Sequence, residues 1–258
     1  MPTSPPEFSS LNVGPINFSA RRPAIIVPVV ATTIQASLDA IQDILLSPHA
    51  NQIEVIEWRI DHVLDSSDLE VLVAAIQNLT TELSSQRLLV TLRTSREGGE
   101  QELSDDAYLH IISSLAPALT GHLIDIEYAR STAAEAIYCA QANEVVVIGS
   151  YHDFKETPSA VQISAHLRAI VHAGADIAKV AVTPNSPEDV LEALSAGLQA
   201  AQKLRRPTMV ISMGRLGAAS RLSAGIFGSC ATFATLGEAS APGQLPVATV
   251  AEARSAMV

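Results

Sequence analysis

Short β-branched runs alternate with longer segments of helical periodicity along most of this chain, and few folds accommodate that pattern. Amphipathic stretches such as SPEDVLEALSAGLQAAQKL stand between the apolar runs, and several begin with a Ser or Asp that suits a helix cap. Because the apolar runs are nearly continuous, they predict strands of a parallel sheet that is covered on its outside. Eight such strands are predicted, at residues 24–30, 52–60, 87–93, 122–128, 144–150, 176–182, 208–213 and 229–235.

Eight strand–helix units within about 235 residues fit a closed (β/α)8 barrel, the TIM-barrel arrangement of the α/β class. We expect a single barrel domain over residues 23–258, preceded by a tail or a short hairpin over residues 1–22. An open, doubly wound sheet is the alternative, but no G-x-G-x-x-G motif follows the first predicted strand. In a barrel, functional side chains gather at the carboxyl ends of the strands.

The charge and hydropathy of the chain limit its partners. Its 258 residues include 27 acidic and 16 basic side chains, for a net charge of −11, which disfavours binding to nucleic acid. No apolar stretch reaches the ~18 residues of a membrane helix, and the first residues lack the pattern of a signal peptide. Cys139 and Cys230 lie in apolar surroundings and are expected to be reduced. We therefore expect a cytoplasmic protein with no nucleic-acid or membrane partner.

Lysine is rare in this chain, and its placement is informative. Lys155 and Lys203 lie in polar contexts, whereas Lys179 interrupts the apolar strand DIAKVAV. Since alternate residues of a barrel strand point inward, Lys179 is predicted to point into the barrel near its mouth. Burial of an ammonium group disfavours its charged form and leaves a nucleophilic amine. The alternative is a lysine in a structural ion pair or one that extends outward to solvent.

One histidine stands out among the seven of the chain. His152 lies in SYHDFKETP, at the end of the strand that precedes the Lys179 strand, so it is predicted to reach the mouth of the barrel. Imidazole is the side chain best suited to move a proton near neutral pH. A structural role is the alternative for His152, and it is the favoured interpretation for the other histidines.

Charged side chains also end the second, third and fourth predicted strands. Glu57 and Arg59 share one face of EWRIDH, Arg93 follows in TLR, and Asp125 and Glu127 share one face of DIE. Inward-facing charges are costly unless they neutralise one another or bind a ligand. The two carboxylates suit a divalent metal, but no histidine accompanies them at ligand spacing, so a salt-bridge network with the arginines is the better interpretation.

Two loops after the last strands are also candidates for binding. The Gly-rich segment 212–229 carries Arg215 and Arg221, which suit a carboxylate or a phosphate. The segment EASAPGQLP at 238–246 is a short polar loop that is predicted to act as a mobile lid over the barrel mouth.

Taken in order, these segments resemble the type I 3-dehydroquinate dehydratase family. The matching pieces span residues 24 to about 250 and read EWRIDH, TLRTSREGGEQ, IDIE, YHDFKETP, GADIAKVAV, SMGRLGAASR, FGSCATF and ASAPGQ. The resemblance implies a (β/α)8 barrel and a hydro-lyase, usually a homodimer, that converts 3-dehydroquinate to 3-dehydroshikimate. It implies no cofactor and no metal.

The resemblance also implies roles for individual residues. On the family pattern, Lys179 forms an imine with the substrate ketone, His152 is the proton shuttle, and Glu97 of the EGGE turn supports the shuttle. A second group contacts the substrate directly. The substrate hydroxyl groups are held by Glu57, Arg59 and Arg93, and the substrate carboxylate is bound by Arg221. The loop that closes over the substrate carries Ser240 and Gln244.

One position departs from the family pattern, and two other functions remain open. Many members have a serine near the end of the first strand, where this chain has Pro28, so a substrate contact from that strand is in doubt. Another Schiff-base barrel, such as a class I aldolase or transaldolase, is one alternative. A dehydratase-like module that senses quinate without turnover is another, although the chain retains both Lys179 and His152 and has no basic DNA-binding segment.

Overall fold

A curled parallel sheet forms the centre of the molecule. The computed structural model describes residues 8–66, 68–237 and 243–257. Within these residues the sheet has nine strands in the order β11-β10-β3-β4-β5-β6-β7-β8-β9, and neighbouring strands pair in parallel. Its strands are β3 (Ala24–Val29), β4 (Val55–Arg59), β5 (Arg87–Thr91), β6 (Leu123–Glu127), β7 (Val146–Asp153), β8 (Ile177–Val182), β9 (Thr208–Ser212), β10 (Ala231–Thr235) and β11 (Leu245–Pro246).

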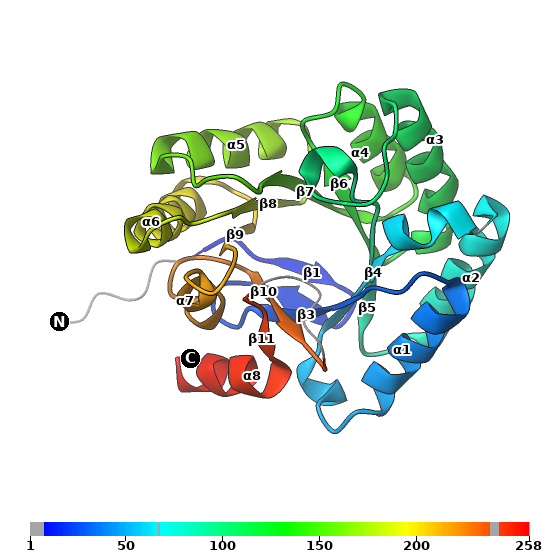
Figure 1. Cartoon of the computed structure of the whole chain (residues 1–258), viewed down its shortest axis with the longest axis horizontal. Coiled ribbons are helices and arrows are strands. Elements are labelled where there is room, and N and C mark those ends of the chain that lie inside the picture. Colours follow the sequence, from blue (N-terminus) through cyan, green and yellow to red (C-terminus); the bar gives the residue numbers. More distant parts are fainter. Residues whose placement is uncertain (1–7, 67, 238–242, 258) are drawn as a thin grey trace.

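Helices cover the outside of the sheet, as Figure 1 shows. They are α1 (Ile34–Leu46), α2 (Leu69–Glu82), α3 (Asp105–Leu115), α4 (Ala133–Ala142), α5 (Ala160–His172), α6 (Pro187–Lys203), α7 (Ala218–Leu222) and α8 (Val247–Ala256). Five begin at a side-chain cap that accepts a backbone N–H, which satisfies a donor the helix itself cannot pair: Thr33, Asp68, Ser104, Ser159 and Ser186. Within the described residues, no helix is long and apolar enough to cross a membrane.

The sheet closes on itself, which confirms the barrel expected from the strand–helix alternation. The N–H of Cys230, just before β10, donates to the carbonyl of Thr208 on β9 at 2.8 Å, and the N–H of Val210 donates to the Ser229 hydroxyl at 3.0 Å. These bonds join the last strands of the curled sheet near their amino-terminal ends. The open doubly wound sheet is therefore excluded.

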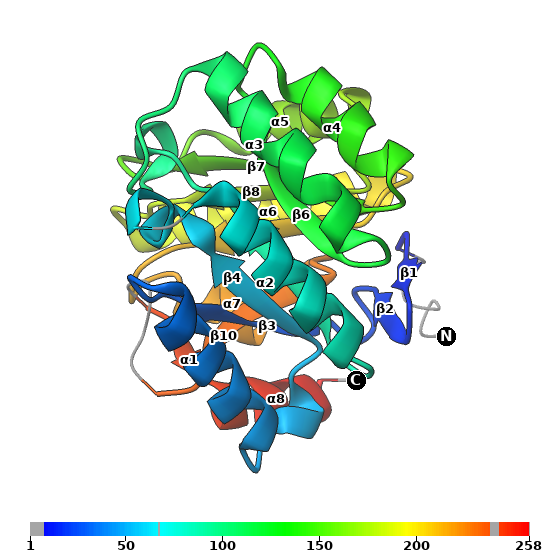
Figure 2. The same ribbon diagram turned by 90° about the vertical axis from the view of Figure 1, so that its right-hand side faces the viewer.

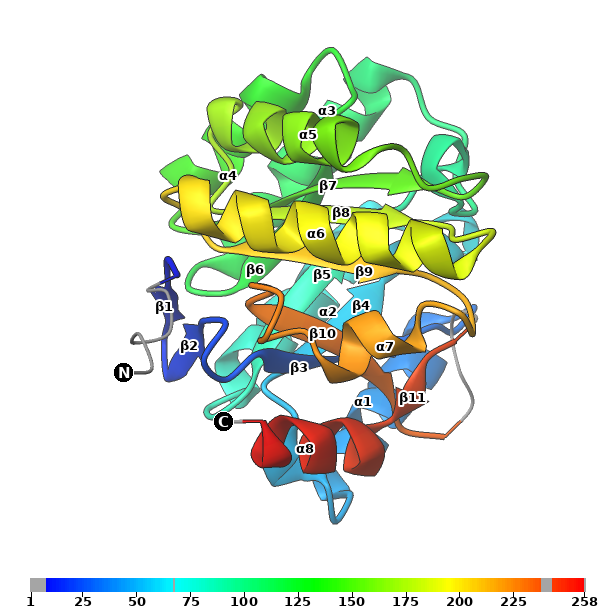
Figure 3. The ribbon, with the colours of Figure 1, turned by 90° about the vertical axis from the view of Figure 1, so that its left-hand side faces the viewer.

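Several strands differ from their predicted bounds by one to three residues, and two elements differ most. The fifth barrel strand runs from Val146 to Asp153 instead of 144–150, because its pairing with β8 continues to Asp153 opposite Val182. The two-residue strand β11 was not predicted, and its length is too short for any periodicity. Helix α7, which was not predicted from the sequence, has only five residues and lies between α6 and α8 (Figure 3).

The interior of the barrel is apolar at one end and charged at the other. The inward positions of β4 read Val55, Glu57 and Arg59, and those of β8 begin with Ile177 and Lys179. The apolar end is closed by an antiparallel hairpin of β1 (Leu11–Val13) and β2 (Ile16–Phe18), whose buried side chains join the interior cluster (Figure 2). The predicted hairpin is therefore present, and it leaves the carboxyl ends of the strands as the open end.

His122 is a structural histidine at the start of β6. Its Nδ1 accepts the N–H of Leu88 at 2.9 Å, and its Nε2 lies 3.2 Å from the carbonyl of Thr80. Only the neutral tautomer satisfies both contacts, because protonated Nδ1 would face a donor. Burial, and to a smaller extent the nearby charge of Arg87, lowers the pKa of His122 to about 4.

This pKa predicts a loss of stability in acid. Between pH 6.5 and about 4 the unfolded chain binds a proton at His122 that the folded chain does not, so the free energy of unfolding falls as the pH falls. We expect His122 to account for a loss on the order of 2 kcal/mol across this window. His122→Asn keeps an acceptor but cannot titrate. Urea unfolding at pH 7 and pH 4 should show a smaller pH dependence for this variant, and an unchanged dependence would contradict the assignment.

Candidate active site

A cavity of about 300 Å³ opens at the carboxyl ends of the barrel strands. Its lining residues come from β4, β5, β7, β8, β9 and β10 and from the loops that follow them. They are Glu57, Arg59, Thr91, Arg93, Glu97, Gly98, His152, Phe154, Lys179, Ala181, Thr183, Ile211, Met213, Gly214, Arg221 and Phe233. Seven residues that the sequence singled out therefore lie around one small volume: Glu57, Arg59, Arg93, Glu97, His152, Lys179 and Arg221.

Lys179 lies on the inner face of β8 and is 4% exposed. Its Nζ donates to Oδ2 of Asp125 at 3.2 Å and lies 4.8 Å from the centre of the Phe233 ring. The strand pairing places Lys179 opposite Ser150, two residues before His152 on β7. Among the described residues, the only lysine that lines this cavity thus has one carboxylate partner and an imidazole on the neighbouring strand.

Arg93 joins the carboxylates of the site. One terminal nitrogen donates to Asp125 at 2.7 Å, and the other reaches Glu97 at 3.2 Å, Glu127 at 3.4 Å and the Ser150 hydroxyl at 3.0 Å. Burial alone would raise the pKa of Asp125, but the positive charges of Arg93 and Lys179 outweigh it and lower that pKa. The charges of three strands therefore neutralise one another, as the sequence predicted for Asp125 and Glu127.

Glu97 and His152 form a pair. Nδ1 of His152 lies 2.8 Å from Oε2 of Glu97, which stands in a one-turn helix, η4 (Ser95–Glu97). Burial lowers the pKa of His152 well below its ordinary value, and the charges of Arg93 and Lys179 add to that effect. Burial also raises the pKa of Glu97 to about 8, although Arg93 opposes this. The contact fixes the ring with Nδ1 toward Glu97, so Nε2 is the nitrogen available to the cavity.

The side chains of Glu57 and Arg59 are each held in one orientation by a hydrogen-bond partner. The Glu57 carboxylate accepts from the Thr91 hydroxyl at 2.8 Å. Arg59 makes two parallel bonds of 2.8 Å to Asp61, and its side chain remains partly exposed to the cavity. A bidentate pair holds the guanidinium plane in one orientation. Both side chains can therefore present hydrogen-bonding atoms to a polyhydroxylated ligand.

Arg221 is the one cation of the site without an acidic partner among the described residues. It is 4% exposed, and its Nε has no hydrogen-bond partner within the described part of the chain. Burial lowers its pKa to about 10, so it remains charged at neutral pH. A buried, unpaired guanidinium is costly, and an anionic ligand would relieve that cost. Arg215, which the sequence also offered for an anion, is exposed and does not line the cavity.

The last predicted segment is described only in part. Ser240 lies outside the described residues. Gln244 directly precedes β11, which pairs with the carboxyl end of β10, so it stands at the same end of the barrel as the cavity. Gly243 has a φ of +78°, and a Cβ there would lie 2.0 Å from the carbonyl oxygen of Gly214, a cavity residue. Pro28 occupies an inward position of β3 opposite Glu57 and supplies no hydroxyl group.

Sequence reasoning missed the residues that support the site from behind. Ser150 bridges Arg93 and Asp125, and Thr94 binds both oxygens of Glu127 through its N–H and its hydroxyl. Arg130 lies behind them, 5% exposed, with bonds to Glu127 at 3.0 Å and to Thr94 at 2.9 Å. None of these three has a periodic or compositional signal that marks it.

Arg130 is predicted to position the charged cluster around Arg93 without lining the cavity itself. If Arg130→Gln removes its charge, Glu127 keeps Arg93 as its nearest cation and draws that side chain away from Asp125 and Glu97. We expect kcat to fall about tenfold, at the lower end of what a displaced catalytic group costs. Arg96→Gln is the matched control, since Arg96 pairs with Asp105, as Arg130 does, but is itself exposed. Steady-state rates that fall equally in both variants would contradict this role.

Asp125 and Glu127 are held by salt bridges instead of presenting free metal ligands. Both carboxylates are bound to arginine or lysine, and the described residues contain no group of three or more His, Cys, Asp or Glu placed to hold a metal ion.

The comparisons with known proteins agree with this geometry. The family model described as Type I 3-dehydroquinase matches residues 25–257. The 3-dehydroquinate dehydratase of Lactiplantibacillus plantarum is 42% identical over 232 residues, covering 89% of this chain and 90% of that protein. The crystal structure of 3-dehydroquinate dehydratase from Geobacillus kaustophilus superimposes with a TM-score of 0.89 at 32% identity, covering 96% of each chain.

A further solved structure is equally similar. It is a type I 3-dehydroquinate dehydratase from Clostridium difficile with covalently modified comenic acid, and it has a TM-score of 0.88 at 29% identity, covering 97% of this chain and 98% of that one. The match of the family model covers most of the barrel, and the relatives are matched over nearly their full length. The chain therefore belongs to the type I 3-dehydroquinase family of hydro-lyases.

Proposed function

We propose that this protein removes water from 3-dehydroquinate to give 3-dehydroshikimate through an imine on Lys179, with His152 moving the protons. The observation that carries the proposal is the placement of Lys179 and His152 on neighbouring strands, facing one cavity that also holds an unpaired arginine. The Lys179 amine can react with the substrate ketone, and the His152 imidazole can act as the base that removes a proton from carbon. The buried guanidinium of Arg221 suits the substrate carboxylate.

The chemistry needs only these groups. The Lys179 amine adds to the substrate ketone and loses one water to form an imine, whose protonated form accepts electron density. His152 then removes a proton from the adjacent carbon, and the resulting enamine expels the β-hydroxyl group, which leaves as water with the proton from the imidazolium. Hydrolysis of the product imine consumes the first water again and frees Lys179. The net change is the loss of one water.

The surrounding residues orient the substrate in this proposal. Arg221 takes the carboxylate, and Glu57, Arg59 and Arg93 hold hydroxyl groups. Glu97 keeps Nδ1 of His152 occupied, so Nε2 carries out the proton transfer. The covalent adduct named in the Clostridium difficile structure is compatible with a nucleophile in this family. We also propose that the protein is cytoplasmic and forms a homodimer, and light scattering of the purified protein would test the dimer.

The first test is turnover. Addition of 3-dehydroquinate should produce the ultraviolet absorbance of a conjugated enone, and the product should comigrate with 3-dehydroshikimate. A class I aldolase would instead cleave a carbon–carbon bond, and a sensing module would bind 3-dehydroquinate with no change in absorbance. Either of those results would overturn the proposed reaction.

Gln244 is proposed to contact the bound substrate from the rim. Gln244→Ala should raise KM about fivefold, the effect of one lost hydrogen bond, while borohydride still traps an imine. Gln199→Ala on the exposed face of α6 is the matched control. Wild-type KM for Gln244→Ala would show that this residue only connects β10 to α8.

A further inference from the structure

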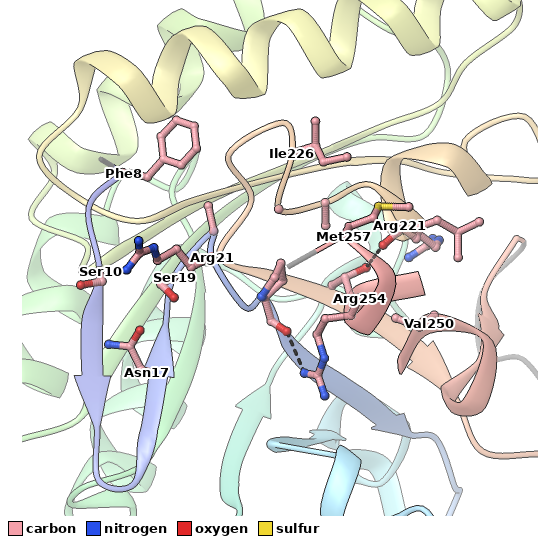
Figure 4. Close-up of a pocket in the computed structure, with 16 residues that line it drawn as sticks. Phe8, Ser10, Asn17, Ser19, Arg21, Arg221, Ile226, Val250, Arg254 and Met257 are labelled. Carbon is pink, nitrogen blue, oxygen red and sulfur yellow. Dashed lines mark hydrogen bonds between the residues drawn. The ribbon is translucent and has the colours of Figure 1, made fainter. Parts of the chain in front are cut away.

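A second, larger cavity lies outside the barrel wall at the opposite end of the strands. Its volume is about 1080 Å³, against about 300 Å³ for the catalytic cavity. The hairpin residues Ser10, Asn17 and Ser19 line one side, and the residues that end α7 and α8 line the other, as Figure 4 shows. Arg221 is the only lining residue of this second cavity to which the dehydration proposed above gives a role.

The charges around this cavity are all positive. Its described lining includes Arg21, Arg221 and Arg254 but no Asp or Glu, in a chain where acids outnumber bases by 27 to 16. Arg254 is neutralised by Glu54 at 2.9 Å. Arg21 is exposed at the hairpin end of the cavity. Cations gathered in a concave surface favour an anionic ligand, and the described lining has no acidic side chain to repel one.

The remaining surface is largely apolar. Phe8, Leu222 and Val250 line it, and Ile226 and Met257 are 53% and 47% exposed at its edge. Large apolar side chains left open to solvent around a concave site indicate a ligand with an apolar body. The combination with arginine and serine side chains points to an apolar body that carries one anionic group.

The two cavities share a wall. Arg221 is the only residue that lines both among those described, and its carbonyl accepts the hydroxyl of Thr232 at 3.2 Å. Thr232 lines the second cavity, and the next residue, Phe233, lines the catalytic one. A ligand that shifts α7 or the start of β10 would therefore move the guanidinium assigned to the substrate carboxylate.

We propose that this second cavity binds an organic anion with an aromatic or alicyclic body, and that its occupancy weakens substrate binding through Arg221. The binding half stands on the cavity alone. The coupling half rests on the proposed function, because it assumes that Arg221 takes the substrate carboxylate.

The binding half is tested without substrate. The probe is 8-anilinonaphthalene-1-sulfonate, and its uncharged counterpart N-phenyl-1-naphthylamine has the same rings without the sulfonate. We expect saturable one-site fluorescence for the sulfonate, weakened about fivefold by Arg21→Gln and about tenfold by Ile226→Asp. Arg168→Gln and Leu191→Asp make the same charge changes on exposed parts of α5 and α6 and should have no effect. Binding that is insensitive to Arg21→Gln and Ile226→Asp would overturn the site.

The coupling half is tested by turnover with increasing probe. Two distinct sites predict an apparent KM for 3-dehydroquinate that rises about fivefold and then reaches a plateau, with kcat unchanged. A KM that rises in proportion to probe concentration without a plateau would place the probe in the catalytic cavity and overturn the coupling. If the protein turns over no 3-dehydroquinate at all, the fluorescence result still decides the binding half.

Discussion

Lys179→Ala is expected to lower kcat by at least roughly 10⁴-fold, because every step of the proposed reaction passes through the lysine imine. The substrate should still bind, since Glu57, Arg59, Arg93 and Arg221 remain in place around the cavity. The measurement is the rate of enone formation, together with substrate affinity from calorimetry.

The variant must be separated from a folding defect. Lys179→Met keeps most of the side-chain volume and leaves Asp125 paired with Arg93, so it should fold and still lack turnover. Lys155→Ala and Lys203→Ala remove the other two lysines and should keep wild-type rates. A Lys179→Met protein with substantial activity would contradict the role of this residue.

His152→Ala is expected to lower kcat by ~10²–10⁴-fold, the usual contribution of a general acid–base group. Because the same imidazole is proposed to assist elimination and imine hydrolysis, the variant should also accumulate a covalent adduct on Lys179. Intact-protein mass spectrometry after mixing with substrate measures that adduct directly.

Glu97→Gln tests the hydrogen-bond partner of His152, and its loss of kcat is compared with that of His152→Ala. The amide keeps a contact to Nδ1 of His152 but removes a carboxyl whose pKa burial raises to about 8. We expect a smaller loss of kcat than for His152→Ala and a changed alkaline limb of the pH–rate profile. If His152→Ala keeps near-normal turnover and accumulates no adduct, the proton shuttle is a different group.

The sequence was sufficient to predict the fold and five of the residues that line the cavity for a simple reason. Period-two alternation decides which side chains of a barrel strand point inward, and it placed Glu57, Arg59, Arg93, His152 and Lys179 on that face. The strand–helix alternation then brings the carboxyl ends of all the strands to one end of the molecule. Both signals are local, so no knowledge of long-range contacts was needed.

The partners of these residues were not predictable in the same way. Ser150 and Arg130 act through contacts to Asp125, Glu127 and Thr94, which depend on the exact pairing between strands. The second cavity lies between the N-terminal hairpin and the ends of α7 and α8, so its lining joins residues that are far apart in the sequence. A short helix of ordinary composition gives no advance signal of the space beside it.

The most direct test of the proposed imine on Lys179 is to trap it by reduction. Sodium borohydride added with 3-dehydroquinate should inactivate the protein and add the mass of one reduced ligand. Peptide mapping should place that ligand on Lys179, and borohydride without substrate should leave the activity unchanged. An unmodified protein that still turns over substrate, or an adduct on Lys155 or Lys203, would contradict the proposed mechanism.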